Sequence, residues 1–102
     1  MAAMPSGLAL VRTTPEFTDR TVPTGLLAAH RVALGTWGRL RVLAGTVRFV
    51  FEDPPATAHD VAAGESIDIP PSTAHRLEPG PGSRFLVEFH ATPTRQDEPP
   101  HN

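Results

Sequence analysis

The sequence contains no cysteine and no lysine. Without cysteine there are no disulfides, thiolate metal sites or cysteine nucleophiles, so a metal ion would have to be bound by His, Asp or Glu. The positive charges are all arginines, and with eleven acidic residues the net charge is −2. This balance is not typical of a surface that binds nucleic acid or an anionic membrane. We therefore expect a small molecule or another protein as the partner, with no nucleic acid and no membrane.

Long apolar runs are also missing. No segment approaches the ~20 apolar residues of a membrane-spanning helix, and the opening "MAAMPSGLALV" has neither the basic start nor the apolar stretch of a signal peptide. We expect a cytoplasmic protein. The length of 102 residues suits one domain. We expect residues 1–91 to form it and residues 92–102, which have no apolar pattern, to be a disordered tail.

Twelve prolines and eight glycines divide the chain into short segments of the length of strands. This predicts an all-β fold of seven or eight short strands in a sandwich or small barrel. The clearest signal is "RLRVLAGTVRFVFE", in which apolar and charged residues alternate on both sides of Ala44-Gly45, and it predicts a β-hairpin. Further strands are expected within 57–61, 66–70, 74–77 and 84–91, with an edge strand within 8–17.

The segment "GLLAAHRVAL", which begins at Gly25, has two possible interpretations. As a strand it would place Leu26, Ala28, His30 and Val32 on one face. Because it is rich in alanine and leucine, a short helix is the alternative.

The histidines are the first candidates for chemistry. His59, beside a turn, and His101, in the tail, are expected to be exposed. His30 and His75 each share a predicted strand face with aliphatic residues. A buried imidazole that lacks a partner costs about 1–3 kcal/mol, so each is either a hydrogen-bonded core residue or a ligand. Two such histidines in one small barrel favour a shared metal or ligand.

The carboxylates near these histidines are the next candidates. Glu78 lies at an odd offset from His75 and faces away from it unless the strand bulges. Glu88 lies opposite the apolar face of the last strand, where a covered carboxylate would need a metal or an arginine such as Arg39. The third metal ligand therefore stays open among Glu88, Glu78 and His90.

One motif resembles a known family. The spacing resembles that of the second cupin motif, in which a glycine, a proline, a second glycine and a histidine recur. Here the glycine is Gly64, Pro70 follows after five residues, and the histidine is His75. Here Ser72 stands in place of the second glycine.

The first cupin motif is only partly matched. Gly45 resembles its closing glycine, and His30 lies near its usual pair of histidines. Val32 replaces the second histidine and Gly38 the glutamate, so a standard centre of three histidines and one glutamate is not implied.

Over about residues 10–91 the chain resembles the small cupin-like proteins related to YeaR and to the N-terminal domain of tellurite-resistance TehB proteins. The segments "TPEF", "TWGRLRVLAGTVRF", "IPPSTAHRLE" and "FLVEF" carry the resemblance. It implies a small double-stranded β-helix, or jelly-roll barrel, that holds a divalent metal, with zinc first and Fe, Mn or Ni as alternatives. The implied metal ligands are His30, His75 and Glu88. The residues expected beside a bound ligand are Arg39, Trp37 and Glu78.

Two functions follow from this pattern. The first is a metal-binding cupin-like protein that holds a small polar or anionic ligand, in a stress or tellurite-type response. The alternative is a non-catalytic homodimeric binding or scaffold module with a structural metal or none. Neither a phosphate loop nor a nucleophile elbow is present, and no particular reaction is predicted.

Overall fold

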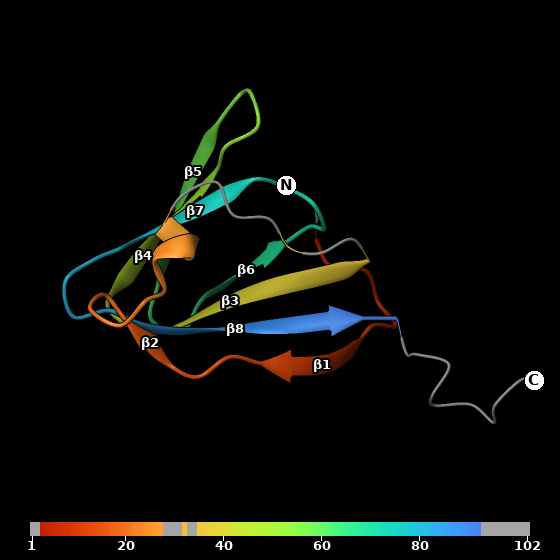
Figure 1. The fold of residues 1–102 in the computed structure, drawn as a ribbon, viewed down its shortest axis with the longest axis horizontal. Helices are drawn as coiled ribbons and strands as arrows, with labels where there is room; N and C mark the ends of the chain where they lie inside the picture. The colour runs from red at the N-terminus through yellow and green to blue at the C-terminus, as the bar shows by residue number, and fades with distance from the viewer. Residues whose placement is uncertain (1–2, 28–31, 33–34, 93–102) are drawn as a thin grey trace, which may run out of the picture.

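The computed structural model describes residues 3–27, 32 and 35–92. These residues form eight strands and one 3₁₀ helix (Figure 1). In chain order the elements are β1 (Ala9–Thr13), β2 (Phe17–Thr18), the 3₁₀ helix (Thr24–Leu27), β3 (Thr36–Ala44), β4 (Thr46–Phe51), β5 (Thr57–Ala62), β6 (Ser66–Ile69), β7 (His75–Pro79) and β8 (Arg84–Ala91). The predicted all-β fold class is confirmed. No helix in the described residues is long and apolar enough to cross a membrane.

The strands form two antiparallel sheets. The first has the order β1-β8-β3-β6, with β2 also paired to β8, and the second has the order β5-β4-β7. Figure 1 shows the strands of the second sheet crossing above β3 and β8. The apolar side chains of both sheets meet in one core, which comprises Val32, Leu40, Val42, Val47, Phe49, Val61, Ile67, Ile69, Leu77, Phe85 and Val87.

The hairpin predicted around Ala44-Gly45 is wrong. β3 pairs with β6 and β8, whereas β4 pairs with β5 and β7, so the two strands belong to different sheets. The buried positions were nevertheless predicted correctly, because Leu40, Val42, Val47 and Phe49 are all in the core. The alternation of apolar and polar residues identifies the buried face of a strand, but it does not identify the strand with which it pairs. Here the two buried faces pack across the core.

The strand predicted from Gly25 is also wrong in its first part. Residues Thr24–Leu27 form a 3₁₀ helix, in line with the helical alternative. Leu26 packs against the core and Val32 is buried. Residues 28–31, which include His30, lie outside the described residues.

The predicted strand near the N-terminus is confirmed at the edge of the first sheet. β1 pairs with β8 in the register Leu10 to His90 and Arg12 to Phe89, with a shift between Leu10 and Arg12. This shift is a β-bulge, in which one extra residue reverses the faces of the residues that follow. It determines which side chains of β1 face the interior.

Candidate functional site

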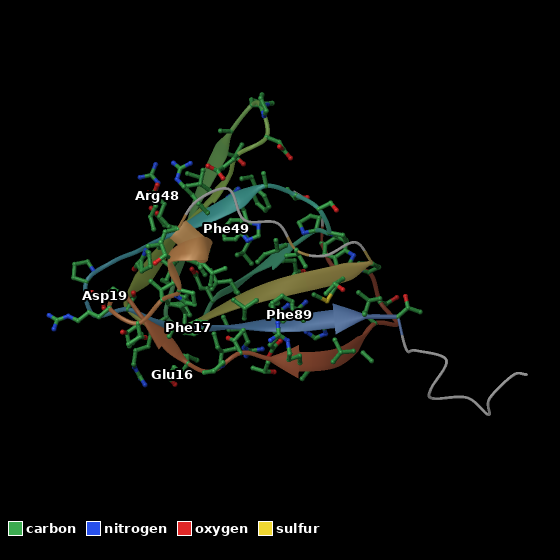
Figure 2. All side chains as sticks on the ribbon, in the orientation of Figure 1. Glu16, Phe17, Asp19, Arg48, Phe49 and Phe89 are labelled. Carbon is green, nitrogen blue, oxygen red and sulfur yellow. The ribbon has the colours of Figure 1, made fainter. Side chains whose placement is uncertain are left out.

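A cavity of about 250 Å³ lies in the barrel, beside the core. Among the described residues that line it, the polar ones are Arg12, Thr14 and His75. The apolar lining comprises Phe17, Pro23, Gly25, Leu26, Val32, Ile69, Leu77, Val87 and Phe89. Figure 2 shows that Phe17 and Phe89 come from strands on one side of the molecule, while Phe49 lies toward the second sheet. An apolar cavity with a few polar groups is the usual form of a small-molecule site.

His75 is the buried polar residue of this cavity. Only 2% of its surface is exposed. Its Nδ1 lies 3.0 Å from the carbonyl oxygen of Thr73, and its ring stacks on Phe49 with centroids 5.1 Å apart. Because a carbonyl oxygen can only accept, Nδ1 carries the hydrogen, and in the neutral ring the lone pair is on Nε2. This is the tautomer in which a histidine with one ring nitrogen held by the backbone can bind a metal or accept from a ligand.

The turn before His75 explains the cupin-like spacing in physical terms. Ser72 has a φ of 57°, a left-handed conformation that favours glycine. The backbone N–H of Ser72 donates to the carbonyl oxygen of Val32 at 2.9 Å. The position where the motif has a glycine therefore needs the glycine-like conformation, and serine adopts it here. The turn delivers His75 as the first residue of β7, on the same buried face as Leu77.

Arg12 and Thr14 were not identified from the sequence as site residues. Regular alternation would put Leu10 and Arg12 on the same face, but the bulge pairs Leu10 with His90 and Arg12 with Phe89. Arg12 therefore lies on the cavity face of β1, with its guanidinium carbon 4.6 Å from the centre of the Phe89 ring. The hydroxyl of Thr14 accepts a hydrogen bond from the backbone of Val87 at 3.0 Å. A bulge has no clear signal in a single sequence.

The structure does not bring Glu88 to His75. Glu88 lies on the face of β8 opposite the cavity, with a side chain that is 17% exposed. Its carboxylate lies 3.2 Å from Nε2 of His90 and 3.6 Å from the guanidinium of Arg41. The requirement for a cation near Glu88 was predicted, and Arg41 meets it. Arg39, its direct neighbour on β3, pairs elsewhere.

Glu78 likewise faces away from the cavity, as its odd offset from His75 predicts. It is on the outer face of the second sheet, where its carboxylate lies 2.9 Å from Arg76 and 3.8 Å from Arg48. The hydrogen bonds that Arg76 donates to Glu78 and, with a smaller effect, to Glu52 raise the pKa of its guanidinium. Glu78 is therefore part of an exposed charge network.

Arg39 and Trp37 lie on the outer face of β3. Nε of Arg39 donates to Asp68 on β6 at 2.7 Å, and this bond raises the pKa of Arg39. Burial raises the pKa of Asp68, but the hydrogen bonds from Arg39 and from the backbone N–H of Met4 outweigh it, so the pKa is lowered. Trp37 is half-buried and lies opposite His90 of β8. Neither Arg39 nor Trp37 lines the cavity of His75.

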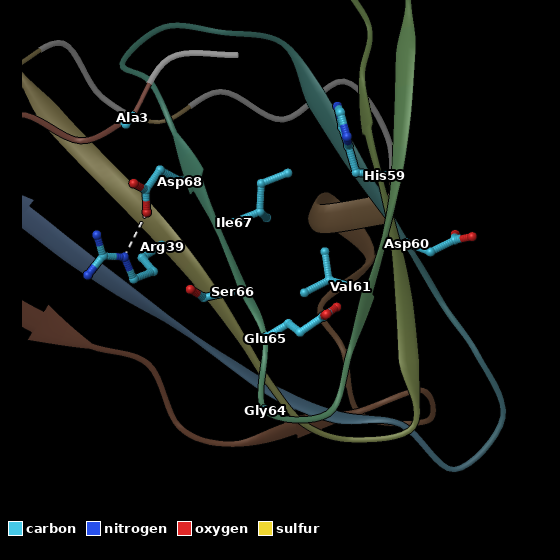
Figure 3. A pocket seen from close by; sticks show the side chains of 10 residues that line it. All are labelled: Ala3, Arg39, His59, Asp60, Val61, Gly64, Glu65, Ser66, Ile67 and Asp68. Atoms are coloured by element: carbon cyan, nitrogen blue, oxygen red, sulfur yellow. Dashed lines mark hydrogen bonds and ion pairs between the residues drawn. The ribbon is translucent and has the colours of Figure 1, made fainter.

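A second hollow of about 760 Å³ opens between the edge strands β5 and β6 (Figure 3). Arg39 and Asp68 line it, and Figure 3 shows them bonded to each other. His59, expected to be exposed, is half-buried on β5, with its ring edge-on to Phe51 at 5.7 Å. This hollow is larger and more open, and it is acidic, because Asp60 and Glu65 line it beside the Arg39–Asp68 pair. The cavity beside His75 is less open and more apolar, and it is the better candidate for a small-molecule site.

The predicted metal ligands are therefore only partly placed. His75 lines the cavity, Glu88, Glu78 and His90 lie outside it, and His30 is outside the described residues. Among residues 3–27, 32 and 35–92, no group of three His, Asp or Glu residues is arranged to hold a metal ion. The set of His30, His75 and Glu88 stays a prediction.

Two facing antiparallel sheets with a cavity and a motif-positioned histidine define a small cupin-like domain. The family model for the TehB-like domain matches residues 12–87. The chain therefore belongs to the TehB-like family. No curated protein matches the sequence.

Two solved structures share the fold. A protein from E. coli strain K12 superposes with a TM-score of 0.81 and 24% identity, covering 92% of this chain and all of that protein. TehB from Haemophilus influenzae superposes with a TM-score of 0.79 and 23% identity, covering 87% of this chain and 33% of TehB. The chain thus corresponds to about a third of TehB.

Proposed function

We propose that this TehB-like domain binds a small molecule in its barrel cavity, with His75 as the principal polar contact. The observation that carries the proposal is the fixed orientation of His75. Its ring is held by Phe49 and by the Thr73 carbonyl, in a wall that is otherwise mainly apolar. A cavity of about 250 Å³ is larger than the apolar cavity of about 150 Å³ that holds benzene.

The cavity proposal is tested by a titration that follows backbone amide shifts. Benzene, a neutral probe, is added to the native protein. We expect saturable shifts at Val32, Leu77 and Val87, which line the cavity. We expect no shifts at Asp60 and Ser66, which line the open hollow. Shifts confined to the hollow, or no saturable shifts, would contradict the proposal.

We also propose that His75 binds a divalent metal, zinc in the first place, together with His30. The support is the lone pair on Nε2 of His75, since neutral imidazole is a common metal ligand. The described carboxylates point away, so two imidazoles would leave coordination positions open for water or for the ligand. When bound, such a metal would supply Lewis acidity to the cavity.

The metal is tested by elemental analysis of protein purified without an affinity tag. We expect the native protein and the control His59→Ala to contain metal, and His75→Ala and His30→Ala to lose it. Native protein free of metal, or His75→Ala with unchanged metal, would refute this part. The cavity proposal would then stand on the titration alone.

A further inference from the structure

We infer that the ligand of this cavity is a monocarboxylate with an apolar body, and that Arg12 is the residue that binds its carboxylate. The inference rests on the proposed function of the cavity. It adds the chemical class of the ligand and a residue that selects it.

The first argument is the position of Arg12. The bulge in β1 takes Arg12 out of the outer face, where alternation from Leu10 would place it, and sets it opposite Phe89. Bulges often occur beside functional sites, where they redirect a side chain. The redirected side chain here is a cation at a cavity whose described lining is mainly apolar.

The second argument is the charge of Arg12, which is not balanced by any carboxylate of the described residues. Of the six other arginines of the described residues, five lie within ion-pair distance of an acidic side chain, namely Arg39, Arg41, Arg48, Arg76 and Arg84, and the sixth, Arg20, is exposed and does not line the cavity. Among the described residues, Arg12 has no such acidic partner, and its recorded contact is the ring of Phe89. Stacking on an aromatic ring orients a guanidinium and leaves its N–H groups available in the plane. Those groups match the two oxygens of a carboxylate.

The third argument is the shape and lining of the cavity. About 250 Å³ exceeds the space that benzene needs, so a six-membered ring with a short acidic side chain fits. The walls beside Arg12 include Phe17, Leu26 and Val87, which favour an apolar body. One guanidinium balances a single negative charge. In the cavity without a metal ion, a dianionic phosphate would leave charge unbalanced against apolar walls.

The experiment compares phenylacetate with 2-phenylethanol, a neutral molecule of similar size. Both are titrated by calorimetry and by amide shifts into the native protein, Arg12→Gln, Arg12→Lys and the control Arg20→Gln. Arg20 is exposed and does not line the cavity. Circular dichroism checks that each variant is folded.

We expect the native protein and Arg20→Gln to bind phenylacetate about tenfold more tightly than 2-phenylethanol, as one charge-assisted contact implies. Arg12→Gln should lose that preference while keeping its affinity for 2-phenylethanol, and Arg12→Lys should keep part of it. Equal binding of the two probes by native protein would overturn this inference and leave the cavity proposal intact. Arg12→Gln binding as the native protein does would overturn it too. If neither probe binds, both fail.

Discussion

Replacing Gly45 with alanine should be more damaging than the same change at other glycines with similar backbone angles. Gly45 is the single residue between β3 and β4, and its φ is +69°. A Cβ added there would lie 2.9 Å from Cα of Ser83 and 3.2 Å from its backbone nitrogen. Gly64 has a φ of +86°, but a Cβ added there would meet no atom within 4 Å. Alanine would meet the same unfavourable positive φ at both positions, but only at Gly45 would its Cβ also contact the backbone of Ser83.

The magnitudes follow from these two terms. Alanine in the left-handed region costs about 1–2 kcal/mol, and about 0.4–1 kcal/mol of this is offset because alanine restricts the unfolded chain. Gly64→Ala should therefore lower the free energy of unfolding by about 0.5–1 kcal/mol. At Gly45 the new methyl group meets backbone that cannot rotate away, and such overpacking adds about 1–3 kcal/mol. Gly45→Ala should lose about 2–4 kcal/mol in total.

The assay is urea unfolding of native protein, Gly45→Ala, Gly64→Ala and Gly82→Ala. Gly82 is a second control, with a φ of +71° and open space around the new Cβ. We expect both controls to unfold at nearly the same urea concentration and Gly45→Ala at a clearly lower one, with similar slopes. If all three variants lost equal stability, the close approach of Gly45 to Ser83 would be refuted.

The remaining predictions concern polar groups. Ser83→Ala should raise the free energy of unfolding by about 1 kcal/mol, because the Ser83 hydroxyl is buried without a partner among the described residues. Thr14→Val should lower the free energy of unfolding by about 1 kcal/mol, because the Thr14 hydroxyl accepts a hydrogen bond from the Val87 amide. Both variants are compared by thermal unfolding, and if Ser83→Ala and Thr14→Val changed the stability in the same direction, this reasoning would be contradicted. The pKa of Asp68 is lowered in the folded protein, so its ionised form stabilises the fold at any pH above the unfolded-state pKa. This stabilisation is lost as the pH falls through the folded-state pKa. Asp68→Asn should therefore lower the free energy of unfolding by about 1 kcal/mol at pH 7 and by progressively less below about pH 4. If urea unfolding gave the same difference between native protein and Asp68→Asn at both pH values, the ion pair with Arg39 would be excluded as its source.

The buried faces of the strands could be predicted from the sequence because alternation depends only on the chain itself. The apolar residues that alternate along the expected strands include Leu40, Val42, Ile67, Phe85 and Val87, and all of them are in the core. The spacing from Gly64 correctly placed His75 at the start of its strand.

The pairing of the strands could not be predicted in the same way. Neighbours in the sequence need not be neighbours in a sheet, and the single residue Gly45 takes the chain from one sheet to the other. In the sequence, Ala44-Gly45 suits the favoured two-residue hairpin turn, whereas in the structure β3 extends to Ala44 and leaves Gly45 as the connection.

The polar lining of the cavity was predicted only in part for a related reason. His75 follows a turn whose proline and glycine-like residues are visible in the sequence. Arg12 faces the cavity because of a shift in register, which depends on how β1 meets β8. Strand parity correctly turned Glu78 away from the cavity, but it could not show that Arg41 would be the arginine beside Glu88.

The bulge in β1 also makes the edge strand tolerant of a change in length. Deleting Val11, the extra residue, would restore regular pairing and would leave Leu10 opposite His90 and Arg12 opposite Phe89. β8, β3 and β6 would keep their mutual pairing, because an edge strand touches only one neighbour. The strand can therefore lose this one residue while Arg12 keeps its place beside Phe89, so a deletion at Val11 offers a simple way to stiffen the edge strand without changing what lines the barrel.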